Sequence, residues 1–199
     1  MQKYTKHPNR INIILDLDNT LISSLAKDEE TSILKPRMKQ FRWENMENVY
    51  KVFERPGLQD FLDFLFDNFS VSVWTAASKS YALFIIEKFI LHNRPTRKLA
   101  CILYSHHCKK SKKLTKKQKA LHILQSHFKM SNYDMNNTYI IDDHPEVYQS
   151  QPQNCIHIKP FEFSDRQSFK DDELLKVIKP KLEKLLELDK NSCGHKQCY

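Results

Sequence analysis

Two carboxylates separated by one residue stand out near the start of the chain. The apolar run Ile13-Ile14-Leu15 leads into Asp16 and Asp18, and the hydroxyl of Thr20 follows. An Ile-rich run of this length is typical of a buried strand in a parallel sheet. Burying two carboxylates there is costly unless a cation or hydrogen-bond donors meet them. The pattern favours a metal-assisted reaction, and the alternative interpretation is an exposed turn after an ordinary strand.

Two later apolar runs end in the same way. The run 71–74 is followed by the hydroxyl of Thr75, and the run 138–141 by the pair Asp142-Asp143. In parallel α/β sheets, ligands bind beyond the carboxyl ends of the strands. We therefore predict that the polar groups at these three strand ends converge on one site.

The residue types indicate the chemistry of such a site. Clustered carboxylates without His or Cys partners suit a hard cation that prefers oxygen ligands, and Mg²⁺ fits best. A carboxylate beside that ion can attack phosphorus and form an aspartyl-phosphate, which water then hydrolyses. A carboxylate two residues further on can protonate the leaving oxygen and later activate water. A hydroxyl and a lysine would bind the remaining phosphoryl oxygens.

The elements that must position these groups alternate between strand and helix. Apolar runs predict strands at about 11–15, 71–74, 100–104, 138–141 and 155–158. Apolar residues at helical spacing predict helices at about 58–68, 79–92, 116–128 and 171–188. This alternation predicts an α/β fold with a Rossmann-like parallel sheet flanked by helices.

Residues 22–53 do not read as the helix expected after the first strand. Ser23, Ser24 and residues 27–30 look like loop, and bulky residues then alternate with polar ones on both sides of the polar turn 44–48. This pattern predicts a β-hairpin insertion at 33–53. The hairpin would lie beside the site and hold an extended substrate, and the alternative is a flap with a purely structural role.

Length and composition set the outer limits. A chain of 199 residues, 40% of them hydrophobic, can form one domain, expected at 10–190, with flexible tails at 1–9 and 191–199. The net charge of +8 favours phosphorylated or otherwise acidic partners. No signal peptide, membrane anchor or regular cysteine spacing is evident, so we expect an intracellular protein of the nucleus or cytoplasm that does not interact with membranes.

A lysine run at 109–119 contains seven lysines in eleven residues. Such runs are mostly solvated faces, and a nuclear-localisation signal or a nucleic-acid patch is the functional alternative. A further possibility is that one of these lysines reaches into the site. The neighbouring histidines and Cys108 match no usual zinc spacing.

Taken together, the motifs resemble the haloacid dehalogenase (HAD) superfamily of phosphotransferases. The run Asp16-Leu17-Asp18-Asn19-Thr20-Leu21 resembles the superfamily signature. Arg55-Pro56-Gly57, Trp74-Thr75-Ala76-Ala77 and Ile140-Ile141-Asp142-Asp143-His144-Pro145 narrow the resemblance. In that order they are similar to the catalytic domain of small, NLI-interacting-factor-like RNA polymerase II C-terminal-domain (CTD) phosphatases. The similarity covers about residues 10–188 and implies an HAD-like fold.

The resemblance also implies roles for individual residues. Asp16 is the expected nucleophile, Asp18 the general acid and base, and Thr75 a phosphate ligand. Mg²⁺ would be held by the side chain of Asp16, the backbone carbonyl of Asp18 and a carboxylate of the Asp142-Asp143 pair.

The phosphate-binding lysine of the family usually stands in a Lys-Asp-Leu-Ser context. The nearest match here is Lys112-Lys113-Leu114-Thr115, so we predict Lys112, with Lys109, Lys110 and Lys113 as competitors.

Three departures from the family pattern bear on the substrate. Asp142-Asp143 stands where Asp-Asn is usual, a change that preserves or strengthens metal binding. The arginine-containing segment before the lysine is replaced by residues 104–108, and the stretch 114–138 is longer than in compact members. The reaction type is therefore better defined than the substrate.

The resulting hypothesis is an Mg²⁺-dependent phosphoserine/phosphothreonine protein phosphatase, with the RNA polymerase II tail as a candidate substrate. A phosphatase of nucleic-acid ends or small phosphometabolites is the second hypothesis, favoured by the lysine run. A phospho-binding module without activity is the third, and the retention of Asp16 and Asp18 argues against it.

Overall fold

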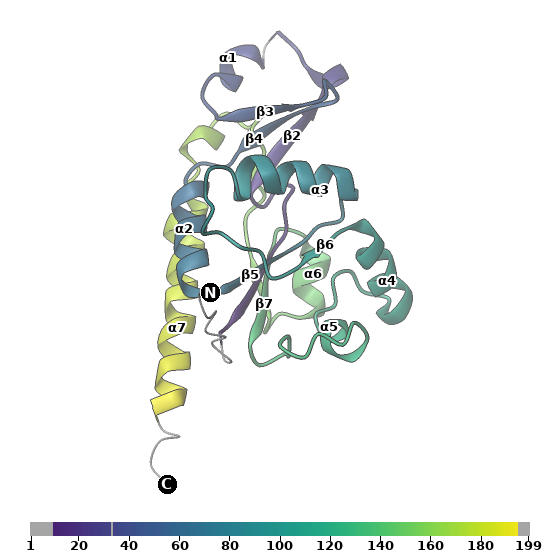
Figure 1. The fold of residues 1–199 in the computed structure, drawn as a ribbon. Coiled ribbons are helices and arrows are strands. Elements are labelled where there is room, and N and C mark those ends of the chain that lie inside the picture. The colour runs from purple at the N-terminus through teal and green to yellow at the C-terminus, as the bar shows by residue number, and fades with distance from the viewer. Residues whose placement is uncertain (1–9, 33, 195–199) are drawn as a thin grey trace.

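The computed structural model describes residues 10–32 and 34–194 and is built on a central five-stranded sheet in the order β6-β5-β1-β7-β8 (Figure 1). All its strand pairs are parallel, with β1 between β5 and β7. The strands are β1 (Asn12–Leu15), β5 (Ser70–Trp74), β6 (Ile102–Leu103), β7 (Thr138–Asp142) and β8 (Cys155–His157). The predicted parallel sheet is confirmed.

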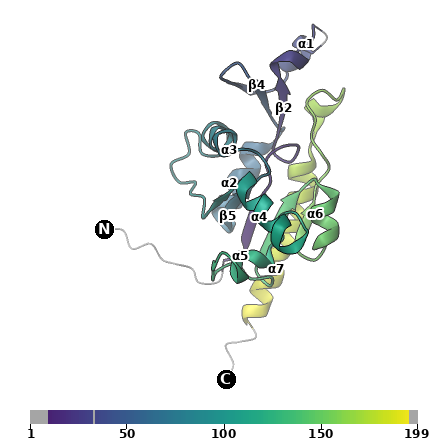
Figure 2. The ribbon, with the colours of Figure 1, turned by 90° about the vertical axis from the view of Figure 1, so that its right-hand side faces the viewer.

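Side chains that alternate along β1 supply two separate cores. Ile13 and Leu15 belong to a core shared with α2, α3 and the C-terminal helices, whereas Ile14 belongs to a core shared with α5 and α6. Helices therefore cover both faces of the sheet, and α4, α5 and α6 lie together in Figure 2. The helices flanking the sheet are α2 (Leu58–Asn68), α3 (Lys79–Ile85) with the π-helix η2 (Ile86–Ile90), α4 (Ser105–Thr115), α5 (His122–Ser126), α6 (Pro145–Ser150), the π-helix η4 (Glu173–Ile178) and α7 (Lys179–Gly194).

The insertion after β1 forms a second sheet, antiparallel and three-stranded, in the order β2-β4-β3. It lies beyond one end of the central sheet (Figure 1). Its elements are β2 (Ile22–Ala26), the 3₁₀ turn η1 (Lys27–Glu29), α1 (Lys35–Met38), β3 (Trp43–Met46) and β4 (Tyr50–Glu54). The predicted hairpin corresponds to β3 and β4, joined by a turn in which Glu47 and Asn48 have positive φ.

Two details of the predicted insertion are wrong. Ser23 and Ser24, expected to be loop, lie in β2 and pair with β4, because tertiary pairing supplies the hydrogen bonds that their irregular pattern does not suggest. The described residues from Lys35 to Met38, expected in the hairpin, form α1. Residue 33 lies outside the described residues.

The helix predicted at 116–128 is also wrong. The chain forms α4 before it and α5 within it, because Lys116 and Lys119 adopt positive φ and interrupt the helix. The helix α4 escaped prediction because only Cys108 and Ser111 are buried along it.

The closing helix begins as a π-helix and continues as α7 to Gly194, past residue 190. The tails predicted at 1–9 and over 195–199 lie outside the described residues. No described helix is long and apolar enough to cross a membrane. The remaining element, the 3₁₀ turn η3 (Ser168–Lys170), precedes the closing helix.

Candidate active site

Three neighbouring strands deliver the predicted polar groups to one edge of the sheet. Asp16 follows β1, Thr75 follows β5, and Asp142 ends β7. The backbone N–H of Asp16 donates to the carbonyl of Ile141 at 3.0 Å, which ties the start of the loop after β1 to β7. Thr75 is buried, and its hydroxyl accepts a hydrogen bond from the N–H of Ala77 at 3.1 Å.

Carboxylate oxygens of Asp16, Asp142 and Asp143 lie within 4.8 Å of one another. Asp142 is fully buried and Asp16 is 7% exposed, while the half-buried Asp143 accepts a hydrogen bond from the hydroxyl of Thr20 at 3.2 Å. Three hard oxygen donors, two of them in the interior, are a donor set that fits Mg²⁺. The carboxylate of Asp18 is not part of this group.

A buried lysine bridges the cluster. The Nζ atom of Lys119 lies 2.6 Å from Asp16 Oδ1 and 2.7 Å from Asp142 Oδ2. The structure does not bring the predicted Lys112 to this cluster, because its side chain is exposed on α4. Lys119 reaches the site because the chain reverses after α4, and Ser111 fixes the reversal by bonding the carbonyl of Lys117 and the N–H of Ala120.

The sequence held a signal for this lysine. Lys119 is the last residue of the run and directly precedes the buried pair Ala120-Leu121, whereas Lys112 is followed by another lysine and the exposed Leu114. A lysine next to an apolar pair is the member of such a run that turns inward most readily. The Lys-Asp-Leu-Ser context of the family pointed instead to Lys112, which lies on the exposed side of α4.

The electrostatics of the cluster follow from its burial. Burial raises the pKa of Asp16 to about 7, Lys119 opposes this, and the charges of Asp142 and Asp143 reinforce it. Burial alone would lower the pKa of Lys119, but Asp16 and Asp142 outweigh it, so the pKa of Lys119 is raised. The ammonium therefore stays charged among the carboxylates.

Asp18 has a hydrogen-bond partner of its own, on α3, that the sequence motifs did not single out. The hydroxyl of Tyr81 donates to Asp18 Oδ1 at 2.6 Å. Burial raises the pKa of Asp18, and the Tyr81 hydrogen bond limits that rise. Tyr81 lies in the first turn of α3, where its N–H donates to the capping hydroxyl of Ser78, and its ring packs edge-on against Tyr50 of β4 at 5.7 Å. The insertion sheet thus extends to the neighbourhood of Asp18.

A buried arginine anchors the loop that carries these groups. Arg55 is fully buried and donates to the backbone carbonyl of Thr20 at 2.9 Å. Its guanidinium also makes two bonds to the carboxylate of Asp171, at 2.8 and 2.9 Å. Such a bidentate pair fixes geometry as well as charge.

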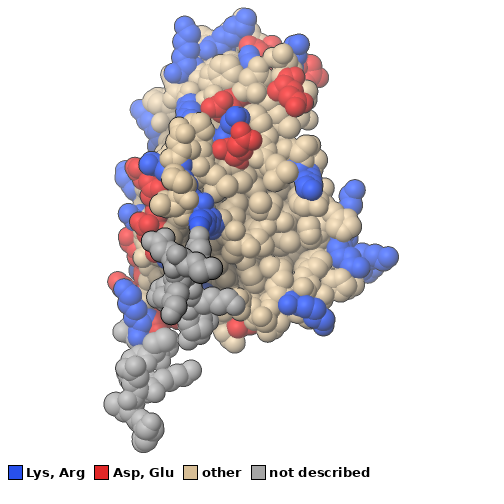
Figure 3. All heavy atoms as spheres, in the orientation of Figure 1, with Lys and Arg blue, Asp and Glu red and all other residues tan. Residues whose placement is uncertain are grey.

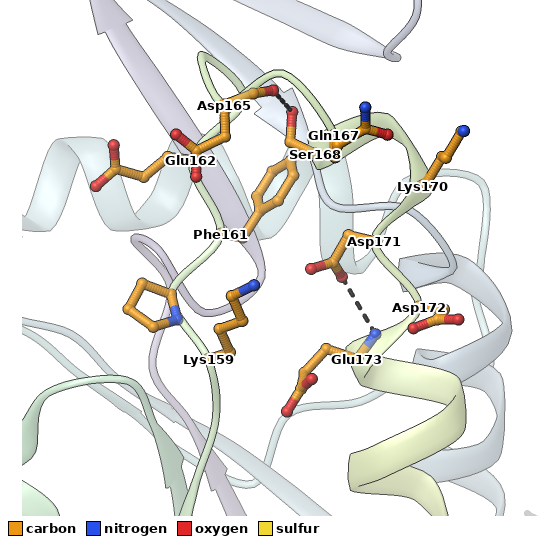
Figure 4. Close-up of a pocket in the computed structure, with 11 residues that line it drawn as sticks. Lys159, Phe161, Glu162, Asp165, Gln167, Ser168, Lys170, Asp171, Asp172 and Glu173 are labelled. Carbon is orange, nitrogen blue, oxygen red and sulfur yellow. Dashed lines mark hydrogen bonds between the residues drawn. The ribbon is translucent and has the colours of Figure 1, made fainter.

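Asp171, the partner of Arg55, also lines a cavity that is rich in carboxylates. A cavity of about 270 Å³ is lined by residues between Lys159 and Glu173, five of them carboxylic acids (Figure 4). The carboxylates are Glu162, Asp165, Asp171, Asp172 and Glu173. Neither Asp16 nor Asp18 lines this cavity, so it is distinct from the candidate site.

Known proteins share both the sequence pattern and the fold. Residues 11–192 match the family model of NLI interacting factor-like phosphatases. "Putative CTD phosphatase-like protein 355R" of Invertebrate iridescent virus 6 is 48% identical over 171 residues, 83% of this chain and 94% of that protein. "Phosphatase PSR1" of Saccharomyces cerevisiae is 30% identical over 179 residues, 87% of this chain and 36% of that protein.

A solved structure adds support for the fold. The structure titled "The Structure of Fcp1, an essential RNA polymerase II CTD phosphatase" matches 98% of this chain with a TM-score of 0.56 at 21% identity. This chain covers 56% of that one, so it spans about half the length of the solved protein. The resemblance drawn from the motifs is confirmed: the chain belongs to the family of NLI interacting factor-like phosphatases.

Proposed function

We propose that this chain is an Mg²⁺-dependent protein phosphatase that removes phosphate from phosphoserine or phosphothreonine through an aspartyl-phosphate on Asp16. The observation that carries the proposal is the position of Asp16. Its carboxylate lies at the end of the central strand, within the acidic cluster and 2.6 Å from the buried ammonium of Lys119.

The reaction follows from the groups around Asp16. A carboxylate oxygen of Asp16 attacks phosphorus, and the bond between phosphorus and the serine or threonine oxygen breaks. Asp18 gives its proton to that leaving oxygen, and its raised pKa favours holding this proton. Asp18 then accepts a proton from the water that attacks the aspartyl-phosphate, which releases inorganic phosphate and restores Asp16.

Tyr81, Lys119 and Thr75 support these steps. Tyr81 binds one oxygen of Asp18, which fixes the orientation of the carboxyl group and leaves its second oxygen for proton transfer. Lys119 and the hydroxyl of Thr75 would bind phosphoryl oxygens as negative charge spreads over them. Asp16, Asp142 and Asp143, with the backbone carbonyl of Asp18, would hold Mg²⁺, which shields the charge between carboxylate and phosphoryl group when bound.

The insertion sheet supports a peptide substrate. Trp43 and Tyr50 are more than a third exposed, and the ring of Tyr50 contacts that of Tyr81. An extended chain laid along this sheet would present a phosphorylated residue to Asp18. The similar Fcp1 is described as an RNA polymerase II CTD phosphatase, so the RNA polymerase II tail is the first peptide to test, and such a substrate implies a nuclear or cytoplasmic protein.

The test is the substitution Asp16→Asn, assayed on an aryl phosphate and on a phosphoserine peptide with Mg²⁺ and with EDTA. We expect turnover by the unaltered chain to require Mg²⁺ and to fall by a factor of about 10³ or more in the variant. The exposed Asp60→Asn on α2 is the matched control and should retain activity. Substantial turnover by Asp16→Asn would overturn the proposal.

The lysine run favours a second candidate, a phosphatase of nucleic-acid ends. The exposed side chains of Lys112, Lys113 and Lys116 would attract phosphate-rich strands. A higher kcat/KM on a terminally phosphorylated oligonucleotide than on any phosphopeptide would support this candidate. Higher activity on small phosphometabolites would instead favour a metabolic substrate, and binding without turnover would favour a phospho-binding module.

A further inference from the structure

Positive charge is concentrated in one continuous segment of the chain. Residues 88–133 contain twelve Lys and Arg and no Asp or Glu, although the whole chain has 24 acidic residues. The rest of the chain therefore carries a net charge of −4, against +8 for the whole. The basic character of this protein is thus a property of one region, which follows β5 and includes α4.

The helix α4 has an inner face directed at the candidate site. The thiol of Cys108 donates to the backbone carbonyl of Thr75 at 3.4 Å, and Ser111 fixes the turn that delivers Lys119 to Asp16. Cys108 and Ser111 are the buried residues of this helix. The helix therefore packs directly against the residues expected to bind phosphate.

The outer face of α4 is a row of lysines. Lys109, Lys112 and Lys113 are exposed, and their spacing of three and four residues places them on one side of the helix. Among the described residues, no carboxylate forms an ion pair with any of the three. In Figure 3, lysine and arginine side chains project from the edge where α4 lies in Figure 1. We call Lys109, Lys112 and Lys113 the lysine face.

We propose that the lysine face binds a second phosphate of a peptide whose first phosphate occupies the active site. The preferred substrate is then a multiply phosphorylated peptide. This inference rests on the proposed function and extends it to a substrate class and a second binding surface.

The dimensions agree with this arrangement. Lys112 lies four residues beyond Cys108, which is about 6 Å along the helix axis. A lysine side chain extends the reach further, so a second phosphate would bind on the order of 10–20 Å from the first. An extended peptide covers that distance in about four to six residues at roughly 3.3 Å each.

The composition of α4 favours a peptide over a nucleic-acid strand. Its sequence, Ser105–Thr115, contains no Arg, Phe, Tyr or Trp. Proteins that bind single strands usually add aromatic platforms on which bases stack, and Arg contributes to that stacking. Lysines alone attract phosphates as point charges without reading bases.

The experiment compares binding of two synthetic peptides that differ only in a second phosphoserine about four to six residues from the first. Binding to the Asp16→Asn chain is measured by fluorescence anisotropy at low and high salt. The test variant replaces Lys109, Lys112 and Lys113 with Gln, and the matched control replaces the exposed lysines of α7, Lys181, Lys184 and Lys190, with Gln. The same lysine substitutions are also made in the chain that retains Asp16. Turnover of an aryl phosphate by these variants checks that the active site is intact.

We expect the Asp16→Asn chain without lysine substitutions, the parent, to bind the doubly phosphorylated peptide about fivefold or more tightly than the singly phosphorylated one. This preference should weaken at high salt. The preference should vanish in the lysine-face variant and persist in the α7 control, with aryl phosphate turnover unchanged in both. Equal binding of both peptides by the parent, or a preference that survives the lysine-face substitution, would overturn the inference.

Two further arms separate the alternatives. The first arm uses an oligonucleotide of equal charge. If it binds more tightly than the doubly phosphorylated peptide and loses affinity in the lysine-face variant, the ligand of the lysine face is a nucleic acid and the peptide inference is overturned. Because the anisotropy arm reads binding alone, it remains decisive if the chain hydrolyses no phosphoester. Failure of the proposed function and failure of this inference therefore give different results.

Discussion

The two edges of the central sheet carry opposite charge where they approach the loop after β1, residues 16–21. After β6, the basic flank formed by α4 and the turn behind it sends Lys119 to Asp16 and Asp142. After β8, the acidic flank at 159–173 sends Asp171 to Arg55, which holds the backbone of Thr20. Each flank contributes one residue to a buried ion pair. The pair on the basic flank includes Asp16, the expected nucleophile, whereas the pair on the acidic flank holds only the backbone carbonyl of Thr20.

This difference shows that burial and pairing do not distinguish a chemical role from a structural one. Lys119 and Arg55 are both almost completely buried and both bond to carboxylates. The two cations differ in their other hydrogen-bond partner. Lys119 also bonds the carboxylate of Asp142 in the acidic cluster, whereas Arg55 also bonds the backbone carbonyl of Thr20. The basic flank should therefore control activity and the acidic flank stability.

The largest effect is expected on the acidic flank. Arg55→Met leaves the carboxylate of Asp171 and the carbonyl of Thr20 without their partner, and should lower the free energy of unfolding by about 3–5 kcal/mol. Urea denaturation measures this loss. The half-exposed pair of Arg42 with Glu54 is the control, since Arg42→Met should cost about 1 kcal/mol or less. Equal losses in the two variants would contradict a structural role for Arg55.

On the basic flank, Lys119→Met should lower kcat on an aryl phosphate by a factor of about 10²–10³, because a buried donor to the developing charge is lost. The matched control is Lys112→Met, the residue that the family motif suggested, which should leave kcat within about twofold because its side chain points to solvent. A large loss of kcat in Lys112→Met together with little loss in Lys119→Met would show that Lys112, and not Lys119, is the lysine required for turnover.

A smaller effect concerns pH and metal. Because the pKa of Asp16 is raised in the folded chain to about 7, folding binds a proton there, so stability falls as pH rises through that value. Without metal, the chain should lose about 1.4 kcal/mol between about pH 6 and 8, or roughly 3–5 °C in Tm. Thermal unfolding in EDTA measures the loss.

Two controls test the source of that pH dependence. Asp16→Asn should remove it, because the amide does not titrate. Saturating Mg²⁺ should reduce it, because a bound cation favours the charged carboxylate at both pH values. If stability instead rises with pH in EDTA, the carboxylate of Asp16 is already charged at low pH.

The sheet and most of the candidate site could be predicted because their signals are local. Apolar runs that end in Asp16, Thr75 and Asp142 are contiguous in sequence, and the rules for parallel sheets bring such strand ends together. The motif Arg55-Pro56-Gly57 was also visible, and Gly57 begins α2 with a φ of +77° at a place where a Cβ atom would lie 2.9 Å from Leu175. Glycine is suited to both demands.

The groups that escaped prediction depend on contacts between distant segments. Lys119 reaches the cluster through the turn that Ser111 fixes, a contact between residues that the lysine run itself does not reveal. Tyr81 has the helical spacing of a core residue, and its hydroxyl reaches Asp18 only because α3 passes close to that carboxylate. The strand β2 shows no clear alternation and is ordered by pairing with β4. Periodicity does not encode such relations.

The central position of β1 has a consequence for the order in which the chain can fold. This strand is synthesised before its partners β5 and β7, which lie roughly 60 and 125 residues further along the chain. Until β7 is synthesised, one edge of β1 has no strand to pair with, and Asp16 has neither Asp142 nor Lys119 beside it. High contact order of this kind slows folding, and the incomplete chain leaves an unpaired apolar strand open to aggregation until residue 142 has emerged.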